Sequence, residues 1–128
     1  MTLHIKPVDT TEYDDVIQAA QAYIDGYRSG DIAGIEKAFH ADAIMWGYSG
    51  DELLQGPAIP AFAGFFNALG ASPDARSRLD ILAIAPTATV VRVDMENDVL
   101  GASFHDFLSL LKIEGQWKII SKIFQRYD

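Results

Sequence analysis

The chain has 128 residues, of which 49% are hydrophobic and 22% charged, a length and balance that predict one compact domain over residues 1–128. Ten basic residues against 18 acidic ones give a formal net charge of −8, which argues against binding to nucleic acid or to an anionic membrane surface. Cysteine is absent, which excludes disulfides, thiolate metal ligands and cysteine nucleophiles.

We expect residues 1–8 to form a short N-terminal extension. This segment has no apolar run of signal-peptide length, and no run elsewhere in the chain approaches the length of a membrane span. The sequence therefore predicts a cytoplasmic protein.

Two helices are predicted in the first third of the chain. Asp9 and Glu12 form a capping-box pattern, and apolar residues then recur at three- and four-residue steps until Gly30. Asp31 can cap a shorter helix that runs to Phe39. The two helices should therefore meet at a tight corner.

A third helix is predicted to begin near Gly56-Pro57 or Pro60 and to end at Gly70. Phe62, Phe65 and Phe66 give this helix an aromatic face. Aromatic residues at helical spacing most often belong to a hydrophobic core, but they could also line a site for an apolar ligand.

Strands are predicted before and after the third helix. The first is expected over Ala43–Tyr48 and is followed by a loop over Ser49–Glu52; the later ones are Leu79–Ala85, Thr87–Glu96, and two long strands over Phe104–Phe124 around a Glu114-Gly115 turn. Most helices come first and a meander of strands follows, which predicts an α+β fold.

The faces of the last two strands are ambiguous from the sequence. The Glu-Gly turn puts Lys112 opposite Trp117, and regular alternation from that pair assigns residues to two faces. One face would carry His105, Phe107, Ser109, Leu111, Lys118, Ile120, Lys122 and Phe124; the other would carry Phe104, Asp106, Leu108, Leu110, Trp117, Ile119, Ser121 and Ile123. The alternation by itself does not say which face lines a cavity.

Lys122 is the most suggestive ionisable residue, because it lies between Ile120 and Phe124 and would lose solvent on an enclosed face. It could bind an anion, move protons or have a lowered pKa, or its stem could simply cover apolar surface. His105 could act as a general base or be an ordinary surface residue. For Asp106 a structural ion pair is favoured over catalysis.

Metal, cofactor and nucleophile motifs are absent from the sequence. The three histidines, His4, His40 and His105, are far apart and have no metal-binding spacing. No P-loop, dinucleotide-binding or nucleophile-elbow pattern is present either. The sequence therefore predicts neither a metal nor a cofactor.

The order of helix, helix, strand, helix and strand meander resembles the nuclear transport factor 2-like superfamily. The resemblance implies a cone in which a curved, mixed or antiparallel sheet packs against three helices, a cystatin-like α+β roll. Within that superfamily, the terminal segment F-H-D-F-L-S-L-L-K-I-E-G-Q-W-K-I-I-S-K-I-F resembles the end of the Putative lumazine-binding family, which is related to SnoaL-like and ketosteroid isomerase-like proteins.

The likeness to ketosteroid isomerases tests one specific chemistry. On that alignment Tyr23 falls where the isomerases carry an oxyanion-stabilising tyrosine, but their general base corresponds to Gly47 and their second acid to Ser109. A glycine cannot abstract a proton, so steroid isomerisation is disfavoured.

The resemblance also implies which residues line a pocket. It turns Phe107, Lys122 and Phe124 toward the cavity and turns Asp106 and Trp117 outward. The implied ligand-binding set is Tyr23, Tyr27, Met45, Phe62, Phe66, Phe107, Ser109, Lys122 and Phe124.

Three functions fit these observations. The first is a protein that binds a small, partly apolar molecule of unknown identity in the cone. The second is a lyase, isomerase or cyclase that uses Lys122 or His105 together with Tyr23. The third is a non-catalytic scaffold; the resemblance implies a homodimer through the sheet in any of the three cases.

Overall fold

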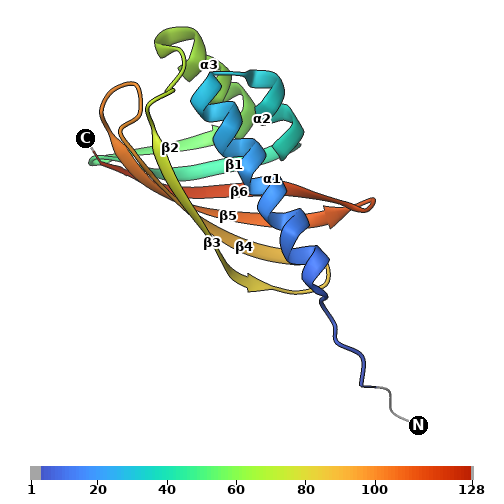
Figure 1. The fold of residues 1–128 in the computed structure, drawn as a ribbon. Coiled ribbons are helices and arrows are strands. Elements are labelled where there is room, and N and C mark those ends of the chain that lie inside the picture. Colours follow the sequence, from blue (N-terminus) through green and yellow to red (C-terminus); the bar gives the residue numbers. More distant parts are fainter. Residues whose placement is uncertain (1–3, 128) are drawn as a thin grey trace.

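In the computed structural model, which describes residues 4–127, three helices cover one face of a six-stranded sheet (Figure 1). The helices are α1 (Thr10–Ser29), α2 (Ile32–Ala38) and α3 (Ala58–Leu69). The strands are β1 (Phe39–Ser49), β2 (Glu52–Pro57), β3 (Arg76–Ile84), β4 (Ala88–Glu96), β5 (Ser103–Ile113) and β6 (Gln116–Tyr127). The predicted α+β class is confirmed.

Residues 4–9 precede α1 without forming a helix or strand. Residues 1–3 of the predicted N-terminal extension lie outside the described residues. Among the helices of residues 4–127, none is long and apolar enough to cross a lipid bilayer.

Helix α1 begins at the predicted cap and is tied to the far end of the chain. The carboxylate of Asp9 accepts a hydrogen bond of 3.1 Å from the N–H of Thr11, which satisfies one free donor of the first turn. The carboxylate of Glu12 turns toward the sheet, where it accepts from Lys112 Nζ at 2.7 Å and from Trp117 Nε1 at 3.0 Å. Glu12 therefore anchors α1 to the β5–β6 hairpin.

The strands follow the order β2-β1-β6-β5-β4-β3. All neighbours are antiparallel except β1 and β6, which run parallel, so the sheet is mixed, as the resemblance implied. The pairing of β1 with β6 brings the third helix, which follows β2, close to the end of the chain. This arrangement creates the space described below.

Strand β2 was not predicted, because a loop and a helix start were expected in its place. Its six residues end in Gly56-Pro57, and proline lacks the N–H that a strand between two neighbours needs. The strand is possible because β2 lies at the edge of the sheet and pairs with β1 alone.

The β5–β6 hairpin contains one irregularity that changes its two faces. Lys112 pairs with Trp117, as predicted, and the pairing continues to Leu110 and Ile119. The next pair joins Ser109 to Ser121, so Ile120 is an extra residue in β6. Such a β-bulge shifts the register by one and reverses which residues face the helices beyond it.

The bulge overturns the predicted orientation of β5. Asp106 has none of its surface exposed and Trp117 only 6%, so both face the helices instead of facing outward. Phe107 is 42% exposed, and Ser109 is exposed as well, so neither faces the helices. The prediction failed because it assumed regular alternation along the whole of β6, whereas Lys122 pairs with Leu108 and lies on the buried side.

Gly47 of β1 lies against β6 where the two strands are parallel, paired with Phe124. A Cβ atom at this position would lie 2.2 Å from the carbonyl oxygen of Phe124 and 2.5 Å from its ring. The absence of a side chain at Gly47 is what lets the Phe124 ring cover the strand.

We expect Gly47→Ala to lower the free energy of unfolding by about 1–3 kcal/mol, because the added methyl group must displace a strand or a buried ring. The matched control is Gly64→Ala: Gly64 is exposed on α3, its Cβ would meet nothing within 4 Å, and alanine favours a helix by about 0.5–1 kcal/mol. Urea unfolding measures both variants. A Gly47→Ala protein that unfolds at or above the wild-type urea concentration would contradict this account.

Candidate functional site

A cavity of about 230 Å³ lies between the sheet and α3. Strands β1 and β6 supply its floor, and α1 and α3 supply aromatic walls. Its lining residues are Tyr27, Met45, Ser49, Leu54, Ala61, Phe62, Phe65, Phe104, Lys122, Phe124 and Arg126. Most of this surface is apolar, and its two cations both come from β6.

Lys122 is buried beneath this cavity, with 8% of its surface exposed. Its Nζ atom lies 4.5 Å from the centre of the Phe124 ring, 4.7 Å from that of Phe62 and 5.8 Å from that of Phe104. Ring faces attract a cation, but they offer no hydrogen-bond acceptor of the strength of an oxygen. Burial lowers the pKa of Lys122, although Asp106 opposes that shift.

Asp106 and Tyr23 lie next to Lys122, deeper in the protein. The hydroxyl of Tyr23 donates a hydrogen bond of 2.5 Å to Oδ2 of Asp106. The other oxygen, Oδ1, lies 3.9 Å from Lys122 Nζ and has no hydrogen-bond partner among the described residues. Burial raises the pKa of Asp106, and Lys122 and Tyr23 act against that rise. The pKa of Tyr23 is raised as well, chiefly by burial, so its proton stays in place.

A second cluster of the same kind lies alongside. Tyr27, one helical turn after Tyr23, donates a hydrogen bond of 3.1 Å to Asp98 Oδ2, and Arg126 Nη2 lies 2.6 Å from that same oxygen. Oδ1 of Asp98 accepts from the backbone N–H groups of Leu100 and Ala102. Both oxygens of Asp98 are thus occupied, and the cluster fastens the β4–β5 loop to the sheet.

The two clusters differ in what they leave unpaired. Each combines a tyrosine of α1, a buried aspartate and a cation of β6, but only the first has a free carboxylate oxygen. Among the described residues its lysine also has no hydrogen-bond partner, and Oδ1 of Asp106 attracts it from a distance of 3.9 Å. Lys122, the member of this cluster that lines the cavity, is therefore the residue that can bind a polar group of a ligand.

The structure brings together five of the residues expected in the pocket: Tyr27, Met45, Phe62, Lys122 and Phe124 all line the cavity. Tyr23 lies behind Asp106 and does not line the cavity. The ring centre of Phe66 lies 6.0 Å from that of Tyr27, so Phe66 supports the cavity wall without lining it. Phe107 and Ser109 lie on the opposite face of the sheet, because the β-bulge at Ile120 shifts the alternation of β6 relative to β5.

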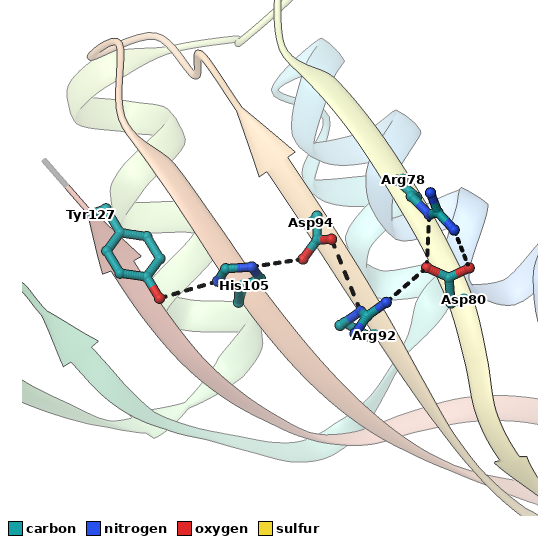
Figure 2. A network of polar contacts seen from close by, with 6 residues as sticks. All are labelled: Arg78, Asp80, Arg92, Asp94, His105 and Tyr127. Atoms are coloured by element: carbon teal, nitrogen blue, oxygen red, sulfur yellow. Dashed lines mark hydrogen bonds and ion pairs between the residues drawn. The ribbon is translucent and has the colours of Figure 1, made fainter.

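His105 also lies on the outer face, in a ladder of polar contacts across four strands (Figure 2). Its Nε2 lies 3.1 Å from Asp94 Oδ1, and its Nδ1 lies 3.1 Å from the hydroxyl of Tyr127. Nη2 of Arg92 lies 3.2 Å from Oδ2 of Asp80, which extends the ladder to β3. His105 is therefore a member of a surface network and not of the cavity.

Sequence reasoning missed several residues of this site. The sequence pattern places Asp106 on the outward face, and it does not point to Asp98 or Arg126. One signal was available for Asp106, because it alternates with Phe104 and Leu108 in a run of apolar residues typical of a buried strand face. Asp98 had no such signal, since it lies in a loop whose partners come from distant elements.

Metal ligation has no support within residues 4–127, where no group of three or more His, Asp or Glu side chains is arranged to hold an ion.

The helix-covered sheet and its cavity define a nuclear transport factor 2-like protein. An NTF2-like protein of unknown function from Methylobacillus flagellatus KT is 30% identical, with 94% of this chain and 96% of that one covered and a TM-score of 0.85. An NTF2-like protein of unknown function from Shewanella baltica OS155 is also 30% identical, with 96% and 99% covered and the same TM-score of 0.85. The superfamily resemblance is confirmed.

The chain also matches one family within this superfamily. The model of the family described as Putative lumazine-binding matches residues 11–125, so the chain belongs to that family, as its terminal hairpin indicated. A relative named Aldolase FrzH, from Cladobotryum sp., is 32% identical over 125 residues, which cover 95% of this chain and 97% of the relative. These findings indicate a small-molecule-binding or enzyme-like protein.

We expect Lys122→Met to make stability fall more steeply with rising pH. The variant removes the cation that lowers the pKa of Asp106, whereas burial still raises it. A carboxyl group with a higher pKa in the folded state holds its proton more tightly there. The free energy of unfolding then falls by up to about 1.4 kcal/mol per pH unit between the unfolded and the folded pKa.

Urea unfolding between about pH 4 and about pH 8 measures this slope. In the double variant Lys122→Met/Asp106→Asn the additional slope should disappear, because no carboxyl group remains to titrate. Equal slopes in the wild type and in Lys122→Met would mean that the lysine does not control the protonation of Asp106.

Proposed function

We propose that the protein binds a small, partly apolar molecule in the cavity, with an oxygen-bearing end directed at Lys122. The observation that carries this proposal is the state of Lys122 itself: its Nζ lies within 6 Å of three aromatic ring centres and has no hydrogen-bond acceptor among the described residues. A ligand oxygen would supply what the protein does not. The aromatic walls would bury the apolar remainder of the ligand.

The size of the cavity supports a small ligand. Sites for drug-sized molecules usually occupy roughly 300–1,000 Å³, and this one has a volume of about 230 Å³. The family description points in the same direction, since lumazine is a small molecule.

A second candidate function is aldol-type carbon–carbon bond chemistry. The specific observation in its favour is the relative named an aldolase, which matches almost the full length of the chain at 32% identity. A lysine whose pKa is lowered by burial is a common catalytic group for carbonyl compounds. His105 does not support an enzyme at this cavity, because it lies on the other face of the sheet, and Tyr23 can act only through Asp106.

We also propose that two copies associate through the outer face of the sheet. Large apolar side chains are exposed there on neighbouring strands, including Trp46 at 44% and Ile123 at 48%. Isolated exposed apolar residues need no explanation, but a contiguous set favours an interface. A scaffold without a ligand would need this interface and not the cavity.

Light scattering at micromolar concentration should give twice the mass of one chain, and Ile123→Glu should give the mass of a monomer with its stability unchanged. Leu100→Glu is the control, because Leu100 is 60% exposed but lies in a loop outside the sheet. A monomeric wild type would contradict the dimer.

Three aromatic probes of similar size test the binding function. We expect acetophenone and benzoate to raise the unfolding temperature by several degrees at saturation, and ethylbenzene, which has no oxygen, to raise it less. A ligand at 100 times its Kd adds about 2.7 kcal/mol to the free energy of unfolding. Differential scanning fluorimetry measures the shifts.

In Lys122→Met the advantage of the two oxygen-bearing probes over ethylbenzene should vanish. Lys118→Met is the matched control on the same strand, because Lys118 contacts the backbone oxygen of Lys37 and does not line the cavity. Equal stabilisation by all three probes in the wild type would show that no oxygen is bound at Lys122.

A further inference from the structure

Lys122 and Asp106 form a buried pair that can exist without charge. Their surfaces are 8% and 0% exposed, and Nζ lies 3.9 Å from Oδ1, beyond the length of a hydrogen bond. Burial lowers the pKa of the amine and raises the pKa of the carboxyl group, so both shifts favour moving one proton from nitrogen to oxygen. A neutral amine is a nucleophile, and a neutral carboxyl group is an acid.

We propose that the cavity takes a small aldehyde or ketone and that the amine of Lys122 forms an iminium ion with its carbonyl carbon. This covalent step rests on the proposed binding function and names the class of its ligand. It also supplies the first chemical step that aldol-type chemistry at this lysine would need.

The step balances without an added reagent. The Nζ lone pair forms a bond to the carbonyl carbon, and the carbonyl oxygen takes up a proton, which gives a carbinolamine. The C–O bond then breaks, and the oxygen leaves as water. One proton of that water comes from the amine and the other from Asp106, so the products are an iminium cation, a carboxylate and water.

The position of Asp106 suits this role. Oδ2 is held by the hydroxyl of Tyr23, so the free oxygen Oδ1 is the one directed at Lys122. At 3.9 Å from Nζ, Oδ1 is near enough to reach the oxygen of a carbinolamine formed on that nitrogen. Tyr23 is a positioning residue, because it orients the carboxyl group and does not line the cavity.

The surroundings also suit the product. The iminium cation would lie among the rings of Phe62, Phe104 and Phe124, whose faces stabilise a positive charge. Its counter-ion would be the Asp106 carboxylate, so the buried site would keep no net charge.

The neighbouring cluster cannot perform this step. Arg126 carries a guanidinium group that does not lose its proton in proteins, and both oxygens of Asp98 already accept hydrogen bonds or an ion pair. Of the two β6 cations that line the cavity, only Lys122 is a candidate for the covalent bond.

Reductive trapping at neutral pH tests the inference, with benzaldehyde as the probe and sodium cyanoborohydride to reduce an iminium ion to a stable benzylamine. An unperturbed lysine is roughly one part in 2,500 free amine at pH 7, and each pKa unit of lowering adds about tenfold. Because burial lowers the pKa of Lys122, peptide mapping by mass spectrometry should find this residue benzylated several-fold more than Lys6, Lys37, Lys112 or Lys118.

Two further results are expected if the adduct forms in the cavity. Benzoate should protect Lys122 from labelling without protecting the other lysines. Lys122→Arg keeps the positive charge but cannot form an iminium ion, so it should lose the preferential labelling and retain stabilisation by benzoate.

The covalent step is wrong if the label is spread over the exposed lysines and is absent from Lys122 in the wild-type protein. The binding function would still stand in that case, provided that acetophenone and benzoate stabilise the protein and depend on Lys122. Mapping of the wild type decides the matter even if a variant fails to fold.

Discussion

The β-bulge at Ile120 reverses the alternation of side chains along β6, so odd-numbered residues face the helices before it and even-numbered residues face them after it. Before the bulge, Trp117 and Ile119 face the helices, and Trp117 bonds to Glu12 of α1. After it, Lys122 and Phe124 face the same side and line the cavity. In a regular strand, burial of Trp117 and Ile119 would send Lys122 to the outer surface. The candidate site therefore depends on a single extra residue.

The interior also places two similar polar clusters side by side and gives them different properties. Asp98 receives a phenol, an arginine and two backbone donors, which makes it a structural anchor for the β4–β5 loop. Asp106 receives one phenol and a lysine that is too far away for a hydrogen bond. Buried polar groups are nearly always paired, so the unpaired Oδ1 of Asp106, one of four such side-chain atoms among the described residues, suggests a function.

Gly47, which corresponds to the general base of ketosteroid isomerases in the resemblance described above, differs from that base in its chemistry and in the space around it. Gly47 lacks the carboxylate that would act as a base, and the Phe124 ring occupies the space that any side chain at Gly47 would need. The same ring contacts Lys122. The cavity therefore has no carboxylate at position 47 and has a buried lysine, Lys122, on β6, on which the proposed binding and covalent step both rest.

Local periodicity, caps, turns and a terminal motif were enough to predict the helices, most strands, the α+β class and the family. The sequence also singled out Lys122 and several aromatic residues of the cavity. Which face of the hairpin is buried became clear from the folded structure alone, since the bulge at Ile120 has no signature in the apolar pattern. The folded structure alone joined Asp106 to Tyr23 and Asp98 to Tyr27, across 83 and 71 residues of sequence, because such pairs arise from packing between distant elements and not from local spacing.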